Sequence, residues 1–331
     1  MTSRTRYFVI ASLLVVLIGL GTGLVAYYVG FPTSAFFAGD GPDELQFVPQ
    51  DATLVAFANV HEIMTSDVRD RARRALPRLP NGQEQFRNET GINVETDIDR
   101  VVACLSRSSE GGQGAGSAAL VLARGRFDAV RIESLMRDHG ASASDYRGVR
   151  LITGAEASAH PGGLSLAFLE PGLVGVGSTS LVRAAIDLKN GGKSVTTNDD
   201  MMKLVRSLDA GNAWAVGRFD ALASQANLPS GVAAQLLPIT WFSASAHVNG
   251  GLRGVLRAEM RDEASANNLR DVVRGFLALA KLQAGSRPDL QPLVQSLDLG
   301  GTGTTLALSF TLPVEMFDLL GAAVGQRMLK R

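Results

Sequence analysis

The first pattern along this chain is a run of residues without charge. Residues 7–30 contain no Asp, Glu, Lys or Arg, and the centre of the run is almost entirely aliphatic. About 20 apolar residues are enough for a helix to cross the hydrocarbon core of a bilayer. The run therefore predicts an N-terminal tail and transmembrane anchor over residues 1–30, with the lipid bilayer contacting residues 7–30.

The charges on either side of the run predict its orientation. Arg4 and Arg6 precede it, whereas Asp40, Asp43 and Glu44 follow it. Positive charge is retained on the cytoplasmic side of a membrane. We therefore expect a single-pass protein of the inner (plasma) membrane, with a cytoplasmic N-terminus and a periplasmic or extracellular body.

A cleaved signal peptide is the alternative interpretation of the same segment. Its apolar region is normally about 7–15 residues long and is followed by small residues at the cleavage site. The segment Thr33-Ser34-Ala35 provides small residues, but the apolar run is longer than a signal peptide needs. The length favours an uncleaved anchor and leaves cleavage open.

Two glycines inside the run suggest a surface for helix pairing. Gly19 and Gly23 form a G-x-x-x-G motif, and small residues at this spacing allow two membrane helices to approach closely. We take Gly19 and Gly23 as a candidate helix-pairing face, for a homodimer or for another membrane protein.

After a linker rich in Pro, Gly and acidic residues, residues 31–46, the apolar residues change to the alternating pattern of β-strands. Ten segments show it: residues 53–60, 100–105, 118–123, 148–152, 164–169, 173–176, 213–216, 241–248, 252–260 and 304–311. Between them, apolar residues at spacings of three and four predict helices over residues 128–139, 179–188 and 263–284. In the longest helix, Leu269, Val272, Val273, Phe276, Leu277 and Ala280 are expected to form one buried stripe. Residues 106–117, which join two strands, and residues 190–198 are predicted to be flexible.

A weak repeat suggests that the body consists of two similar units. Residues 123–129 (ARGRFDA) resemble residues 215–221 (AVGRFDA), and both mark the passage from a strand into a helix; residues 59–63 are a degenerate third copy. We therefore predict an α+β fold, in which an N-terminal transmembrane helix is followed by two antiparallel-sheet-plus-helix units. The first covers residues 47–205, the second covers residues 206–325, and a basic tail covers residues 326–331.

Composition excludes several classes of function. Lys plus Arg and Asp plus Glu each number 32, so the basic excess typical of nucleic-acid-binding proteins is absent, and no nucleic-acid partner is expected. A single cysteine, Cys104, allows no intrachain disulfide and no multi-cysteine zinc site. It lies in an apolar strand and is expected to be a small core residue.

The motifs that resemble known chemistry fail on their context. Gly192-Lys193-Ser194 resembles the end of a phosphate-binding loop, but Asp187 stands where the first glycine is needed and a helix precedes the motif. The four histidines (His61, His139, His160 and His247) have no metal-binding spacing; His139 is expected on the interior side of its helix. The sequence therefore identifies no catalytic residue, no metal ligand and no cofactor site.

The chain resembles a set of uncharacterised bacterial proteins that are anchored by one membrane span. The resemblance lies in the order of the segments and in the P-x-D-A entry into the first strand, here Pro49-Gln50-Asp51-Ala52. It implies a location in the cell envelope and a repeated α+β body, with no established activity and no site residues.

Three functions follow from these observations. The leading hypothesis is a non-catalytic accessory or binding subunit of an envelope or membrane complex. A hydrolase whose site assembles from scattered residues is the first alternative, and it requires a pocket that contains a histidine next to a carboxylate or hydroxyl. The second is a carrier of lipid or another apolar ligand, which requires an apolar cavity beneath the helix at residues 263–284.

Overall fold

The computed structural model describes residues 41–75, 87–88, 90–107, 117–154, 163–208, 211–219, 238–248, 250–285 and 291–314. Contacts divide the chain into two compact units. Unit 1 contains the described residues of segments 41–61 and 79–206, and unit 2 contains those of segments 62–78 and 207–331. The predicted boundary near residue 205 lies beside this division, although residues 62–78 belong with the second unit.

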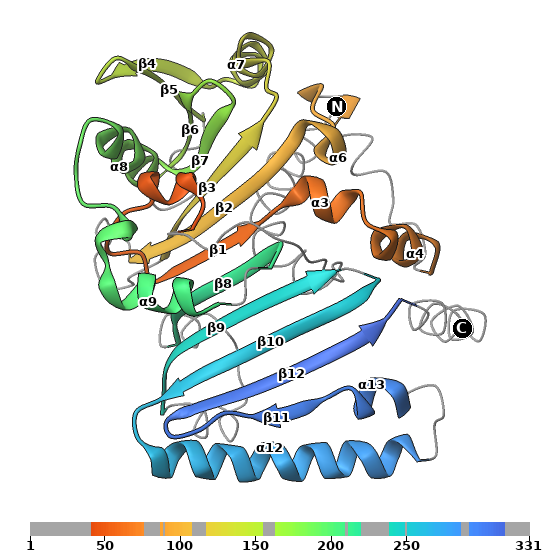
Figure 1. Cartoon of the computed structure of the whole chain (residues 1–331). Helices are drawn as coiled ribbons and strands as arrows, with labels where there is room; N and C mark the ends of the chain where they lie inside the picture. Colours follow the sequence, from red (N-terminus) through yellow and green to blue (C-terminus); the bar gives the residue numbers. More distant parts are fainter. Residues whose placement is uncertain are drawn as a thin grey trace. The chain divides into compact units, whose positions relative to one another are not determined.

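Unit 1 contains an antiparallel sheet with the strand order β1-β2-β3-β7-β6-β5-β4 (Figure 1). Its strands are β1 (Leu54–Ala58), β2 (Ile98–Arg107), β3 (Ser117–Gly125), β4 (Ser142–Tyr146), β5 (Val149–Thr153), β6 (Leu164–Glu170) and β7 (Leu173–Ser178). All five residues of β1 are buried, which accounts for its continuous apolar sequence, because a strand covered on both faces needs no polar positions.

The chain forms short helices before, between and after these strands. They are η2 (Asp43–Phe47), α3 (Val60–Met64), α6 (Val94–Asp97), α7 (Ala129–Asp138), α8 (Thr179–Lys189), η3 (Val195–Thr197) and α9 (Asp199–Ser207). Helix α8 packs on β6 and β7 through a stripe at helical spacing, in which Leu181, Val182, Ala185 and Ile186 are buried. At α7, the Asp128 carboxylate accepts a hydrogen bond from the Arg131 amide, as expected for an N-cap.

Unit 2 contains an antiparallel sheet with the order β8-β9-β10-β12-β11. Its elements are α4 (Asp67–Ala75), β8 (Ala213–Arg218), β9 (Ile239–Val248), β10 (Gly251–Met260), α12 (Glu263–Ala284), α13 (Gln291–Gln295), β11 (Asp298–Gly300) and β12 (Thr305–Pro313). Helix α12 lies beside β12 and α13 (Figure 1). It begins at Asp262, whose carboxylate accepts a hydrogen bond of 2.7 Å from the Ser265 amide.

The fold class is confirmed as a mixed α+β structure with mainly antiparallel sheets, and each of the ten predicted strands is present. Residues 106–117 do join two paired strands, because β2 and β3 pair in antiparallel fashion. Residues 108–116 lie outside the described residues, so the flexibility of this segment stays a prediction. Two strands were not predicted. Strand β4 (SASDY) is mostly exposed and has no apolar face, and β11 is only three residues long.

The repeated segments do mark passages from strand to helix. Strand β1 leads into α3, and β3 leads through Asp128 into α7. Strand β8 ends at Arg218 and Phe219 is helical; the second aspartate of the repeat, Asp220, lies outside the described residues. The similarity therefore reflects a shared local transition.

The structure corrects the predictions for two segments, residues 190–198 and the helix α12. Residues 190–198 were expected to be flexible, yet Val195 is fully buried, its amide donates to the Val48 carbonyl at 2.8 Å, and Ser194 pairs with Pro49. In α12 the predicted stripe was too wide, because Phe276 is 66% exposed.

The linker also differs from its predicted bounds. Residues 43–46 fall within η2, and both Glu44 and Leu45 are 1% exposed, so the folded body begins before residue 47. The predicted anchor at residues 7–30 lies outside the described residues. Among the helices that the structure does describe, none is long and apolar enough to cross a membrane.

Candidate functional site

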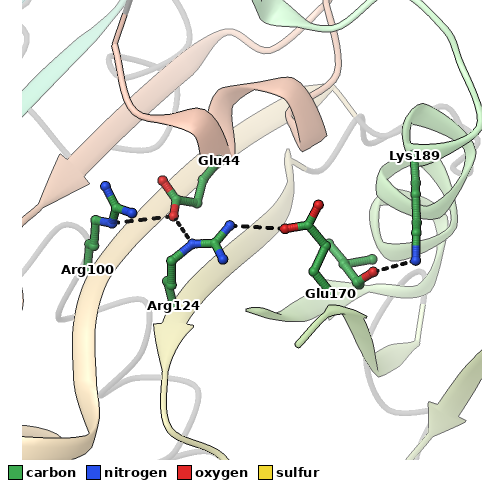
Figure 2. Close-up of polar contacts among 6 residues, drawn as sticks. Glu44, Arg100, Arg124, Glu170 and Lys189 are labelled. Atoms are coloured by element: carbon green, nitrogen blue, oxygen red, sulfur yellow. Dashed lines mark hydrogen bonds and ion pairs between the residues drawn. The ribbon is translucent and has the colours of Figure 1, made fainter. Parts of the chain in front are cut away.

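A buried cluster of charges lies at the start of the folded body. Glu44 lies on η2, and its Oε1 atom accepts a hydrogen bond from Arg124 Nε on β3. The same oxygen lies 3.5 Å from Arg100 Nε on β2. Arg124 Nη2 also donates to Glu170 Oε2 at 3.2 Å, and the neighbouring Lys189 Nζ donates to the Leu169 carbonyl at 2.7 Å (Figure 2). The cluster joins the end of the linker to three strands of unit 1.

The register of the strands explains why a carboxylate is needed there. Arg100 and Arg124 are direct partners across β2 and β3, and like charges in such positions destabilise a sheet. Burial by itself lowers the pKa of Arg124, but its hydrogen bonds to Glu44 and Glu170 outweigh that effect, and the pKa is raised. Glu44 therefore places one negative charge between two cations, and Glu170 adds a second beside Arg124. The Glu44 side chain is 1% exposed, so this carboxylate is engaged by the protein itself, and we call the cluster the clamp.

An open groove of about 890 Å³ lies elsewhere on unit 1, beside α8 and α9. Its lining includes Asp51, Asp187, Asp199, Asp200 and Lys193. Asp187 already pairs with Arg147 at 2.9 Å and accepts a hydrogen bond from Tyr146 Oη at 3.2 Å. Within the described ranges, no group of three or more His, Cys, Asp or Glu residues is arranged to hold a metal ion. Asp187 is thus engaged in a surface ion pair, and the described lining provides no metal site.

A smaller groove of about 480 Å³ lies beside α6 and α7. Its charged groups are used locally. Arg126 lies 3.6 Å from Asp97, and Asp128 is the N-cap of α7. This groove supplies no free acid–base pair of the kind that general catalysis uses.

The histidines do not assemble with either groove. His61 and His139 are exposed, and His139 Nδ1 lies 2.7 Å from the Leu135 carbonyl, so the prediction of an interior His139 is wrong. His247 on β9 is 3% exposed, and His160 lies outside the described residues. Neither groove has a histidine in its lining. The hydrolase hypothesis therefore gains no site from the part of the chain that the structure describes.

The surface with the clearest capacity to bind is the C-terminal half of α12. Phe276, Leu279 and Leu282 are 66%, 56% and 76% exposed. They follow one another at intervals of three residues and so lie on one side of the helix. We call these three side chains the α12 docking face.

The N-terminal half of the same helix is packed. Ala266 and Leu269 form a core with Ile239, Met260 and Leu306, and Val273 packs against it. This core occupies the place where the carrier hypothesis needs an apolar cavity. Among the described residues, α12 covers packed side chains at this end.

The sequence-based candidates fall outside these features. Gly19 and Gly23, the predicted helix-pairing face, lie outside the described residues, and pairing through them stays a prediction. Neither the clamp nor the docking face was predicted from the sequence. A signal for the docking face was present, since the apolar positions of residues 272–284 extend around more of the helix than one buried stripe requires.

Comparisons with known proteins add little to this description. No family model matches the chain, and no curated protein matches it. Among solved structures, one described as "Structure of crystal form I of TP0453" is similar with a TM-score of 0.44 and 11% sequence identity, covering 87% of this chain and 99% of that chain. A likeness at this level says nothing about what either protein binds.

Proposed function

We propose that this protein is a membrane-tethered, non-catalytic binding module of the cell envelope. The uncharged run at residues 7–30 holds it in the inner membrane, and its body lies on the extracytoplasmic side. The observation that carries the proposal is the α12 docking face, where Phe276, Leu279 and Leu282 are each more than half exposed.

Exposed apolar side chains on soluble proteins are usually scattered, and contiguous groups of them mark interaction sites. Of the five large hydrophobic residues described as exposed, these three lie within seven residues of one helix. Burying a Leu or Phe side chain stabilises an assembly by about 1.5–3 kcal/mol. A surface that covers this face therefore has a substantial source of binding free energy.

Binding is favoured over catalysis by how the charged residues are used. In the two grooves, Asp187 and Asp97 are paired with arginines and Asp128 caps a helix, and the Glu44 carboxylate is almost completely buried. The docking face, by contrast, is accessible and has no role in the core.

Cysteine accessibility in native membranes tests this proposal. Leu279→Cys places a thiol on the docking face, and the matched Lys281→Cys places one on the other side of the same helical turn. The native Cys104 is a silent background because it is buried and its pKa is raised to about 12. We expect a water-soluble maleimide to modify Lys281→Cys quickly and Leu279→Cys slowly. In concentrated urea both should react quickly, and this arm uses a Cys104→Ala background because unfolding exposes Cys104.

Two results would contradict the proposal. Equal modification of both thiols in native membranes would show that nothing covers the docking face. Release of the whole chain from membranes by alkaline carbonate would show that residues 7–30 do not serve as an anchor.

A further inference from the structure

We infer that the surface covering the α12 docking face is the lipid bilayer itself, with the C-terminal half of α12 lying in the plane of the membrane interface. This inference rests on the proposed function, because it names the partner of the same face.

The shape of the docking face suits an interface between water and lipid. Phe276, Leu279 and Leu282 span an arc of about 120° around the helix, given its 100° rotation per residue. Helices that lie on membranes insert an apolar side of this kind into the boundary between headgroups and acyl chains. The helix that carries the docking face is fixed in the core of unit 2 through Ala266 and Leu269, and Ala284 at its C-terminal end is also buried, so the face has a rigid support.

The charges on this half of the helix indicate how it would bind. Residues 272–284 include two cations, Arg274 and Lys281, and no acid. Both lie roughly 140–160° around the helix from Leu279, so they point away from the docking face. Arg274 also pairs with Asp271 at 3.2 Å. Attachment would therefore depend on apolar contact, with little contribution from anionic headgroups.

The predicted tether makes the bilayer a permanent neighbour. The folded body begins with η2 at Asp43, which leaves only residues 31–42 between it and the anchor. Twelve extended residues reach about 40 Å. A tether of this length holds the body near the membrane at a high effective concentration, whereas a separate protein partner has to be encountered by diffusion.

Lipid-specific quenching of a fluorescent label tests this inference. The full chain carrying Leu279→Cys is labelled with an NBD dye and reconstituted into phosphatidylcholine vesicles with or without spin-labelled lipid. We expect spin-labelled lipid to quench the dye, and we expect no change at high salt. The same dye at Lys281→Cys should be quenched by iodide in the water and not by the lipid label. Adding Phe276→Ser and Leu282→Ser to Leu279→Cys should remove the lipid quenching without changing thermal unfolding.

Each other outcome overturns the inference. Iodide quenching at position 279 equal to that at position 281 would show a face open to water. Protection from iodide without lipid quenching would show contact with a second copy of the chain. Loss of lipid quenching at high salt would show an electrostatic attachment.

The proposed function can survive this failure. Protection of Leu279→Cys in native membranes, combined with no lipid quenching in vesicles of pure protein and lipid, would identify a protein partner for the same face. Release by alkaline carbonate would instead remove the proposed function itself.

Discussion

At the scale of single residues, the start of the folded body depends on one carboxylate. Arg100 and Arg124 face each other across β2 and β3, and Glu44 places an almost fully buried charge between them. Glu44 Oε2 is buried and has no hydrogen-bond partner within the described part of the chain. The contribution of Glu44 to the stability of the fold therefore comes from the contacts of its Oε1 atom with the two arginines.

We predict that Glu44→Gln lowers the free energy of unfolding by about 2–3 kcal/mol, because it leaves two neighbouring cations without a buried counterion. Urea denaturation of the full chain in mild detergent measures the change. Asp138→Asn, at an exposed position of α7, is the control and should change stability by less than about 0.5 kcal/mol. Adding Arg100→Gln to Glu44→Gln should restore part of the loss, and purely additive effects would disprove the clamp.

The buried thiol of Cys104 should make the free energy of unfolding depend on pH. Burial, and secondarily the negative charge of Asp51, raises the pKa of this thiol from 9.0 to about 12. The unfolded chain thus loses the thiol proton above pH 9 while the folded chain keeps it, and the stabilisation present below pH 9 is lost as pH rises towards 12. Relative to Cys104→Ala, the native chain should lose about 1.4 kcal/mol per pH unit above pH 9. A stability difference that stays constant between pH 8 and pH 10.5 would show that the thiol is hydrated in the folded state.

At the scale of elements, α12 has two halves with different roles. Leu269 is buried in the core, whereas Leu282, further along the same helix, is 76% exposed. The continuous apolar pattern of this helix therefore includes residues that pack in the core and residues that form the docking face.

Stability measurements should separate these halves. Leu269→Ala removes buried methyl groups and should lower the free energy of unfolding by about 2–4 kcal/mol. The double variant Phe276→Ser and Leu282→Ser changes only exposed side chains and should stay within about 0.5 kcal/mol of the native chain. Urea denaturation in detergent compares the two. A large loss in the double variant would mean that the face packs within the protein.

A helix or strand could be predicted from the sequence where its apolar pattern and its capping residue lie within the element itself. Strands such as β9 and β10 alternate over ten residues, and α12 carries its own N-cap at Asp262. The clamp was not predictable, because Glu44 lies in an acidic stretch that resembles a linker and its partner Arg124 is 80 residues away. Only the register of β2 and β3 brings the two arginines together. The extent of burial on α12 likewise depends on how far its neighbouring strands and α13 cover it.

At the scale of the whole molecule, the chain contains two units, each of which includes antiparallel strands. The clamp belongs to unit 1, where the predicted tether enters, and the docking face belongs to unit 2. Attachment to the anchor and contact through α12 are thus assigned to different parts of the chain and can be altered separately.

Replacing residues 1–35 with a cleavable signal peptide separates the anchor from the body. The replaced segment ends before Glu44 and η2, so the clamp stays intact and the body should fold. We expect the altered chain in the soluble extracytoplasmic fraction and the native chain in membranes after carbonate washing. Gly19→Ile with Gly23→Ile is the matched control, since it alters the predicted pairing face and keeps an apolar run long enough to span the bilayer. If the native chain were instead found soluble and shortened near Ala35, the run would be a signal peptide, and the bilayer would no longer be held next to α12.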